Sequence, residues 1–413
     1  MTRIQMENGA AKVVERLLCA GHDAYVVGGC VRDALLGKAP NDWDICASAL
    51  PEETMALFGE ENCIPTGLKH GTVTVKMDGG FYEVTTFRMD GDYSDGRHPD
   101  RVDFVKNVCA DLARRDFTIN AMAYNDRDGL VDPFGGAEDL LVRRVVRAVG
   151  DPMARFSEDA LRVMRLFRFA ARYGLEIDAE TKAGAIALRR NLRCVSGERT
   201  REELLKLLAA AKPSAYLPKE IIDVIVPEME TVGGAAYEQL LCAVDAVPAD
   251  GELRLAALLS ALCTACSQTP AERVIKRLHC SNKTMNRILL AVKGALDDYQ
   301  EEDGALHVRA RYALGRHGME AVEDMLALGS ALRSPEAAGR LERFAAHARM
   351  AKAQRLCCSL KELAVTGQDV MQLSGPGPQT GVVLSALLDA VIRGTLQNER
   401  GALLEAAAQM AKE

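Results

Sequence analysis

The 413-residue sequence lacks several features that would place it in a membrane or secreted class. None of its apolar runs is long enough to span a membrane, and the most apolar one, 253–266, has the length of a buried helix. The first residues form no apolar leader, because charged side chains interrupt them. Twelve cysteines in such a chain predict reduced thiols and a cytoplasmic protein that does not contact a membrane.

The sequence also lacks a net positive charge, since its formal charge at pH 7 is −7. That argues against binding nucleic acid through overall charge, but it leaves room for a local basic surface. Residues 151–212 hold 13 lysines and arginines against 9 aspartates and glutamates, so this segment carries +4. Any surface for RNA or phosphate is therefore expected in this middle segment.

Strand-like stretches occur almost only before Gly150. They are rich in β-branched and aromatic residues and are bounded by Gly, Asp or Pro: "AYVVGG", "DWDICAS", "GTVTVKM", "FYEVTTFR" and "RVDFVKN". From Ser157 onward the pattern is helix after helix, with Gly and Pro between them. The sequence therefore predicts the α+β class, with a mixed head followed by an all-α remainder.

Asp42 and Asp44 are separated by one residue in a candidate strand. Alternation along a strand sends both carboxylates to one face and Trp43 to the other. Two crowded carboxylates are tolerated when a divalent cation lies between them, and Mg²⁺ prefers carboxylates together with phosphate oxygens. Glu83 on a neighbouring strand is a candidate third carboxylate, or a solvated residue at the sheet edge. A solvated turn would also explain the aspartate pair, so this motif alone does not decide.

Gly28 and Gly29 follow a buried strand and precede "CVRDALLG", a short predicted helix that Gly37 closes. Backbone N–H groups at such a turn can cradle an anion, and Arg32 on the helix could reach phosphates held there. The spacing matches neither the dinucleotide-binding nor the Walker glycine pattern. A plain strand-to-helix turn accounts for these residues equally well.

Residues 111–125, "DLARRDFTINAMAYN", place a charged cluster at the start of an otherwise apolar predicted helix. Asn120 follows Asp116 by four positions, so both side chains would share one helical face. This pair could hydrogen-bond a ribose hydroxyl while Arg115 contacts a phosphate. The alternative is that Asp116 and Thr118 only cap the start of the helix.

A further charged helix is predicted over 155–174, where Asp159, Arg162 and Arg165 follow at intervals of three. Asp159 presents acceptors and Arg162 presents donors, so side by side they could pair with the edge of a base. Cytosine and adenine each offer an amino donor beside a ring-nitrogen acceptor, whereas guanine and uracil reverse that order. The alternative is a surface ladder of ion pairs, although the phenylalanines of this helix leave few faces for water.

The order of these motifs resembles that of class II tRNA nucleotidyltransferases, the CCA-adding enzymes, and of their relatives the bacterial poly(A) polymerases. The motifs are GG-x-VRD-x-LLG, DxD, RRDFTINAMAYN, DPFGG, RFSEDALRVMRLFRFA and SGERTREELLKLL. The resemblance is continuous from residue 1 to about 210. Beyond that point the resemblance is weaker, but "LAVTGQDVMQL" and the segment up to Arg400 are similar to the family's C-terminal tail, which contacts the tRNA elbow.

The resemblance implies a polymerase-β-like head at 1–142, a helical neck at 143–212, a body at 213–330 and a tRNA-binding tail at 331–413. It also implies template-independent addition of C, C and A to the tRNA 3′ end from CTP and ATP, with release of pyrophosphate. The tRNA would be contacted at its acceptor stem and its elbow.

The same resemblance implies a role for each motif residue. Asp42 and Asp44 would be catalytic and would bind Mg²⁺. The nucleotide would be bound by Gly29, Arg32, Arg115, Asp116, Asn120, Asp159, Arg162, Arg165 and Arg168. Within this set, Asp116 with Asn120 would recognise the ribose, and Asp159 with Arg162 would be the protein template that selects C or A.

Several alternatives stay open. The seven histidines give no indication of a C-terminal HD phosphohydrolase domain, so none is expected. The polar loop at 88–104, which CC-adding relatives tend to lack, favours full CCA addition. An A-adding enzyme or a poly(A) polymerase would keep this loop too, although the acidic chain has no Lys/Arg-rich tail. An inactive RNA-binding protein is disfavoured by the retained aspartates, and the sequence leaves monomer and homodimer open.

Overall fold

A seven-stranded mixed sheet forms the N-terminal part of the chain, with strand order β3-β4-β5-β2-β1-β8-β9. Neighbouring strands are antiparallel except for β2 and β5, which run parallel. The strands of the sheet are β1 (Ala24–Val27), β2 (Ile45–Ala47), β3 (Cys63–Gly67), β4 (Thr72–Met77), β5 (Gly80–Thr86), β8 (Ala123–Asn125) and β9 (Gly129–Val131). The short strands β6 (Arg88–Asp90) and β7 (Val102–Phe104) form a separate hairpin.

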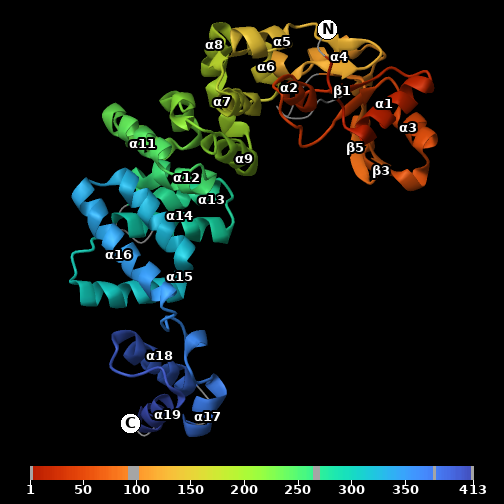
Figure 1. Cartoon of the computed structure of the whole chain (residues 1–413). Helices are drawn as coiled ribbons and strands as arrows, with labels where there is room; N and C mark the ends of the chain where they lie inside the picture. The colour runs from red at the N-terminus through yellow and green to blue at the C-terminus, as the bar shows by residue number, and fades with distance from the viewer. Residues whose placement is uncertain (1–2, 92–101, 264–269, 375–377, 411–413) are drawn as a thin grey trace. The chain divides into compact units, whose positions relative to one another are not determined.

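The computed structural model describes residues 3–91, 102–263, 270–374 and 378–410. Its contacts divide the chain into two units, Met1–Glu230 and Thr231–Glu413 (Figure 1). Most of the predicted polar loop, at 92–101 and including His98, lies outside the described residues. The predicted boundaries at 142, 212 and 330 therefore stay predictions, since the contacts divide the chain only after Glu230.

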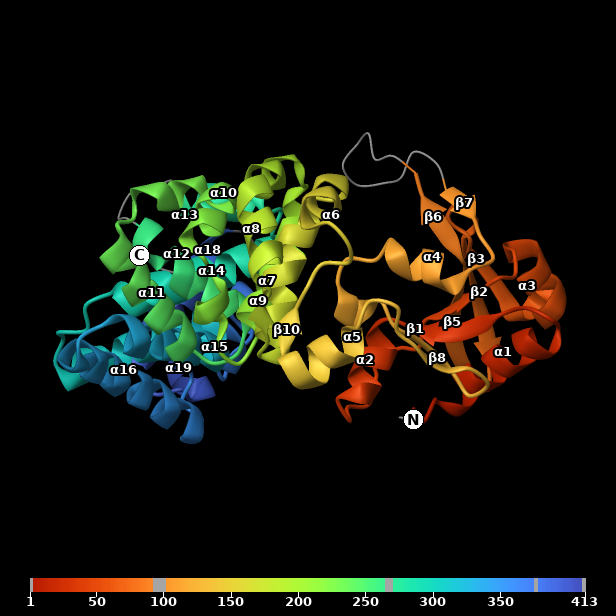
Figure 2. The ribbon, with the colours of Figure 1, turned by 90° about the horizontal axis from the view of Figure 1, so that it is seen from above.

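The central strand β1 is buried along its whole length because the residues of "AYVV" are apolar or aromatic on both faces. Tyr25 and Val27 pack with Phe87 and Leu112 in one buried cluster. Helices α1 (Asn8–Cys19) and α3 (Pro51–Phe58) also pack against the sheet (Figure 2). Covered in this way, the sheet forms a rigid support for the loops that leave its strands.

The remaining helices of the first unit surround and follow the sheet. They are α2 (Gly29–Leu35), α4 (Val108–Ala113), α5 (Gly136–Glu138), α6 (Pro152–Glu158), α7 (Leu161–Tyr173), α8 (Ala179–Leu188), α9 (Gly197–Leu208) and α10 (Lys219–Ile225). The only other strands described there are the two-residue pair β10 (Val145–Val146) and β11 (Glu176–Ile177). The predicted change from a mixed head to a helical remainder is thus confirmed.

Two predicted helices are wrong in detail. The segment 111–125 is not one helix: α4 ends at Ala113, Thr118–Asn120 form a 3-10 turn, and β8 follows. The sheet overrides local helix propensity here, because Val26 pairs with Tyr124. The helix predicted over 155–174 is broken at Asp159, whose backbone is extended between α6 and α7.

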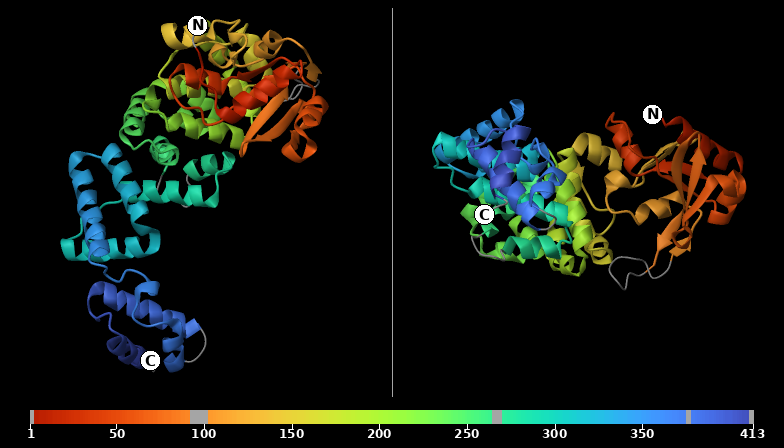
Figure 3. Two further views of the ribbon diagram at one scale, coloured as in Figure 1. Left: turned by 45° about the vertical axis from the view of Figure 1, so that its right-hand side comes forward. Right: turned by 90° about the horizontal axis from the view of Figure 1, so that it is seen from below.

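The second unit is helical throughout the residues that the structure describes. Its helices are α11 (Gly234–Ala246), α12 (Gly251–Leu259), α13 (Pro270–Arg277), α14 (Asn282–Leu296), α15 (Asp303–Leu332), α16 (Pro335–Ala353), α17 (Gly367–Ser374), α18 (Pro378–Arg393) and α19 (Arg400–Met410). The long helix α15 bends where Gly318 has a φ of +80°, and α16 lies beside it (Figure 3). Within the described ranges, no helix is both long and apolar enough to span a membrane.

The His-Asp pair of the sequence, His22-Asp23, lies in the turn between α1 and β1. Asp23 accepts a hydrogen bond from Arg127 at 2.8 Å, and both side chains are half-exposed. This pair is therefore part of a surface ion pair of the head.

A substitution at Gly136 tests how tightly the head is packed. A Cβ at this buried position would lie 2.1 Å from the carbonyl oxygen of Thr118. We expect Gly136→Ala to lower the free energy of unfolding of the first unit by about 1–3 kcal/mol, as overpacking does. Urea unfolding measures this. Gly339→Ala, at an exposed position of α16 with open space around it, is the control and acts on the second unit. The control should gain up to about 1 kcal/mol, so equal effects of the two substitutions would contradict the prediction.

Candidate functional site

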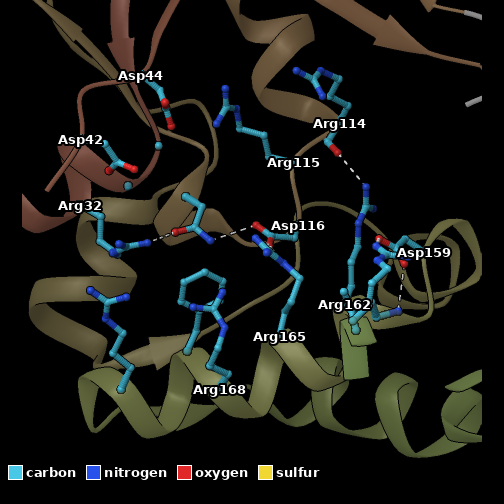
Figure 4. A pocket seen from close by; sticks show the side chains of 17 residues that line it. Arg32, Asp42, Asp44, Arg114, Arg115, Asp116, Asp159, Arg162, Arg165 and Arg168 are labelled. Carbon is cyan, nitrogen blue, oxygen red and sulfur yellow. Dashed lines mark hydrogen bonds and ion pairs between the residues drawn. The ribbon is translucent and has the colours of Figure 1, made fainter. Parts of the chain in front are cut away.

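One pocket of the first unit brings together every site residue predicted from the sequence. Figure 4 shows the side chains around this pocket, whose volume is about 460 Å³. The predicted residues that line it are Gly29, Arg32, Asp42, Asp44, Arg115, Asp116, Asn120, Asp159, Arg162, Arg165 and Arg168, together with Gly28. Elements far apart in the sequence meet here: the turn after β1, the segment before β2, the segment after α4, and helices α7 and α9.

The pocket is strongly basic. Eight arginines and four aspartates line it, which gives the lining a net charge of +4 although the whole chain carries −7. Five of its residues were not assigned to the site from the sequence: Arg114, Leu161, Phe169, Arg172 and Arg199. Such a lining favours a ligand that carries several negative charges.

The aspartate pair lies immediately before β2 rather than within it, because that strand begins at Ile45. Trp43 is buried, while Asp42 and Asp44 both line the pocket, as the alternation predicted. The pKa of Asp44 is raised to about 6, first because the surrounding protein displaces water, then by the charges of Asp42 and Glu83. Arg115 opposes this only in part. The negative charges of Asp42 and Asp44 are thus only partly compensated, and they lie in a pocket that favours an anionic ligand. Two such carboxylates are ligands that suit Mg²⁺.

Glu83 is exposed on β5. Among the described residues, no three Asp, Glu, His or Cys side chains lie close enough together to hold a metal ion. Glu83 therefore acts on Asp44 through its charge and does not complete a three-carboxylate cluster.

The glycine turn after β1 is shaped by the arginine that passes over it. Gly28 has a φ of +77°, and a Cβ there would lie 2.8 Å from Nη1 of Arg115. The predicted short helix after this turn is confirmed as α2, which places Arg32 in the pocket. Glycine is thus required both for the backbone conformation and for the close approach of a guanidinium group.

A chain of buried polar contacts crosses the pocket floor. Arg32 donates to Oδ1 of Asn120, and Nδ2 of Asn120 donates to Oδ1 of Asp116 at 3.0 Å. Nε of Arg165 donates to Oδ2 of Asp116 at 2.8 Å. Burial would raise the pKa of Asp116, but the charge of Arg165 and the hydrogen bond from Asn120 outweigh it and leave the pKa at about 2. The predicted pairing of Asp116 with Asn120 is thus present, although no α-helix carries it.

Asp159 and Arg162 both face the pocket but are not paired with each other. Oδ2 of Asp159 accepts from Arg199 of α9 at 2.9 Å, and its Oδ1 accepts from the backbone N–H of Leu161 at 3.0 Å. That second bond explains the break before α7, because a local side-chain acceptor competes with the helix.

The donors of Arg162 are also occupied. Its Nη1 donates to Glu158 at 2.6 Å. The side chains of Asp159 and Arg162 are only 15% and 11% exposed. These low values contradict the alternative of a solvated surface ladder.

Helix α9 supports the pocket from behind. Its Glu203 is buried and forms an ion pair with Arg168, whose guanidinium stacks on Phe169 at 3.9 Å. Neither Glu203 nor Arg199 was singled out from the sequence, although both lie in the "SGERTREELLKLL" segment. The spacing of Arg199 and Glu203 was the available signal, because residues four positions apart on one helix share a face.

Comparison with protein families matches three parts of the chain. The Poly A polymerase head domain matches residues 24–147, and the RNA and SrmB-binding site of polymerase A matches 174–230. The tRNA nucleotidyltransferase domain 2 matches 252–407. The three matches follow one another in the order expected from the sequence motifs.

Individual proteins are similar over nearly the full length. The CCA-adding enzyme of Levilactobacillus brevis is 36% identical over 400 residues, which is 96% of this chain and 96% of that protein. The crystal structure of the Bacillus stearothermophilus CCA-adding enzyme in complex with CTP superposes with a TM-score of 0.78 at 31% identity, covering 98% of each chain. The Thermotoga maritima CCA-adding enzyme complexed with tRNA shares the fold, with a TM-score of 0.64 at 22% identity over 97% of this chain and 94% of that one.

The raised pKa of Asp44 predicts a pH-dependent cost to stability. The folded protein holds a proton on Asp44 up to about pH 6, whereas the unfolded chain loses it near pH 3.8. The free energy of unfolding should therefore fall as the pH rises from 3.8 to about 6, and above this range it should stay lowered by the full amount. In EDTA, Asp44→Asn should be more stable than wild type at pH 8, and the difference should shrink towards pH 4. Thermal unfolding at both pH values measures this. A variant no more stable than wild type at pH 8 would contradict it.

Proposed function

Because the chain belongs to the CCA-adding enzymes, within the class II tRNA nucleotidyltransferase and poly(A) polymerase family, we propose that it adds C, C and A to the 3′ end of tRNA. The substrates are CTP and ATP, and pyrophosphate is released. One observation carries the proposal: a single basic pocket is lined by two adjacent carboxylates, by the hydrogen-bonded Asp116 and Asn120, and by Asp159 and Arg162. The contacts of each group support a separate part of the reaction.

Asp42 and Asp44 hold Mg²⁺ in this proposal. Bound there, the metal supplies charge neutralisation for the triphosphate and activation of the 3′-hydroxyl. The raised pKa of Asp44 supports the assignment, since a nearby dication would relieve the crowding of negative charge.

The arginines at the head side of the pocket bind the triphosphate. Arg115 lies against Gly28 and Arg32 lies over the rings of Tyr173 and Phe169, at 4.6 and 5.3 Å. Held in this way, the guanidinium groups lose little further freedom on binding phosphate. Positioning and electrostatics together supply most of the rate in phosphoryl transfer.

Asp116 and Asn120 recognise the ribose. Because the pKa of Asp116 is about 2, its carboxylate is ionised at neutral pH and can only accept hydrogen bonds. A ribose hydroxyl can donate to it, and Arg165 holds the carboxylate in place at 2.8 Å. Arg168, fixed by Glu203 and Phe169, completes this side of the nucleotide site.

Asp159 and Arg162 form the protein template. The carboxylate accepts from the amino group of cytosine or adenine, and the guanidinium donates to the adjacent ring nitrogen. Arg199 and Glu158 hold these groups in the free protein. A matching base replaces those internal partners, whereas guanine or uracil would leave both template groups unpaired, which is costly in a partly buried pocket.

The tRNA is bound by the helical remainder of the chain, with the neck, body and tail divided as the sequence predicted. Helices α17, α18 and α19 enclose a small apolar core of their own, which includes Val370, Leu387 and Leu403. We place the contact with the tRNA elbow on this tail and the acceptor stem nearer the pocket.

A single series of incubations tests the proposed function. Purified protein and Mg²⁺ are mixed with tRNA transcripts that end before CCA, after CC or after CCA, together with CTP, ATP or both. Restoration of CCA followed by a stop is the expected result. Addition of A alone to the CC-ended transcript would make the protein an A-adding enzyme, and long A tails on every primer would make it a poly(A) polymerase. Absence of any product would overturn the proposal.

Asp42→Ala should abolish addition. Loss of one of two metal-binding carboxylates is expected to lower the rate at least about 10³-fold, or about 4 kcal/mol. Single-turnover addition of C measures this. Glu52→Ala at an exposed position of α3 is the control, and should leave the rate unchanged. A residual rate within tenfold of wild type would remove Asp42 from the mechanism.

Asp159→Ala should relax base choice more than it slows chemistry. The discrimination between CTP and UTP is expected to fall by at least about tenfold, because a base-specific pairing provides about 1–3 kcal/mol. Ratios of kcat/KM for the four nucleotides measure this. Asp151→Ala removes the N-cap of α6, the helix that ends just before Asp159, and is the matched control outside the pocket. Equal rejection of GTP and UTP by wild type and the Asp159 variant would rule out the template.

A further inference from the structure

A carboxylate that does not line the pocket is buried directly behind two of its arginines. Asp111 lies on α4 and is 0% exposed. The sequence motifs did not assign it a role, because it precedes the charged Arg-Arg-Asp cluster by one turn. Its neighbours Arg114 and Arg115, in contrast, both line the pocket.

The two oxygens of Asp111 are shared between these arginines. Oδ1 accepts from Nε and Nη2 of Arg114, both at 2.9 Å, and Oδ2 accepts from Nη2 of Arg115 at 3.2 Å. The backbone N–H of Arg88 also points to Oδ1, at 3.3 Å. Burial alone would raise the pKa of Asp111, but the two guanidinium groups outweigh it and hold the pKa below its usual value. The carboxylate is thus ionised, and both arginines are bound to it in one fixed arrangement.

Arg115 is constrained at both ends of its guanidinium group. Nη2 donates to Asp111, and Nη1 lies so close to Gly28 that a Cβ at this position would contact it. Without Asp111, these two adjacent positive charges would repel each other within a lining whose net charge of +4 already includes them. In the described part of the chain, the Arg115 side chain is hydrogen-bonded by Asp111, and the charge of Asp44 attracts it as well.

We infer that Asp111 is a positioning residue for the nucleotide's phosphates: its buried carboxylate aims Arg114 and Arg115 at the triphosphate beside the Gly28–Gly29 turn. The inference rests on the proposed function, since it assumes that this turn receives the phosphates. Asp111 itself touches no substrate. Its removal should therefore weaken the binding of phosphate groups more than that of the nucleoside or the tRNA.

Isothermal titration calorimetry with magnesium pyrophosphate tests the inference without requiring catalysis. Asp111→Asn keeps the shape but removes the charge, and should weaken pyrophosphate binding about tenfold, the loss expected for one charged hydrogen-bonded contact. Asp111→Glu keeps the charge but displaces it by one methylene. Its affinity for pyrophosphate should lie between those of wild type and Asp111→Asn, about threefold weaker than wild type. Asp111→Glu also carries the test should Asp111→Asn not fold. Wild-type affinity in both variants would overturn the inference.

Asp139→Asn is the matched control. Asp139 is another buried carboxylate of the head, bonded to Arg147 at 2.9 Å and to Thr118 at 2.7 Å, and it does not line the pocket. Its loss should lower thermal stability while pyrophosphate affinity stays within about twofold of wild type, because no phosphate-facing arginine depends on it. If Asp139→Asn weakened pyrophosphate binding as much as Asp111→Asn does, the loss of any buried charge in the head would have this effect. That result would overturn a specific role of Asp111.

Kinetics give an independent readout. In Asp111→Asn the KM for CTP should rise about tenfold while kcat changes less than about threefold and the KM for tRNA stays unchanged. A uniform fall of kcat with an unchanged KM for CTP would contradict a positioning role. Absence of addition by the wild type would overturn the proposed function alone, since the calorimetric result stands without turnover.

Discussion

The candidate site depends above all on one buried carboxylate, that of Asp116. It accepts hydrogen bonds from Asn120 on one oxygen and from Arg165 on the other, and so joins the segment that precedes β8 to helix α7. An isolated charge at this depth would be strongly unfavourable, so the carboxylate requires its partners as much as they require it. The head and helix α7, which bears Arg162, are thereby linked by charge as well as by apolar packing.

The excess of arginine in the pocket poses a second constraint. Most of these side chains are held by carboxylates that lie beside or behind the pocket, such as Glu158 for Arg162, Glu203 for Arg168 and Asp111 for Arg114. The protein thus keeps its positive groups apart and aimed in one direction before any nucleotide arrives. Preorganisation of this kind reduces the reorganisation that accompanies binding and reaction.

Much of the site could be predicted from the sequence, because its residues lie in short motifs of chemically specific types. The glycine turn, helix α2 and the aspartate pair before β2 were all found by local pattern. The errors arose where tertiary contacts outweigh local propensity. Residues 121–125 have a helical composition, yet their last three residues form β8, which pairs with β1. Asp159 interrupts a predicted helix because its side chain accepts a hydrogen bond from the backbone N–H of Leu161.

Three of the residues that sequence reasoning missed, Arg199, Glu203 and Asp111, act through other residues. Arg199 and Glu203 bond to Asp159 and Arg168 from a helix about forty positions away, and Asp111 contacts no pocket space at all. No local pattern predicts which carboxylate will lie behind which arginine, because that depends on how α4, α7 and α9 pack. Such supporting contacts become visible only in three dimensions.

The order of strands in the sheet also affects how the chain is made. Strand β1 lies between β2 and β8, yet β8 is formed by residues 123–125. During synthesis, one edge of the most apolar strand stays unpaired until about a hundred more residues have left the ribosome, which takes seconds at ordinary elongation rates. An apolar strand with a free edge is prone to pair with other chains. The sheet of the head can therefore close around β1 only after residue 125 has been synthesised.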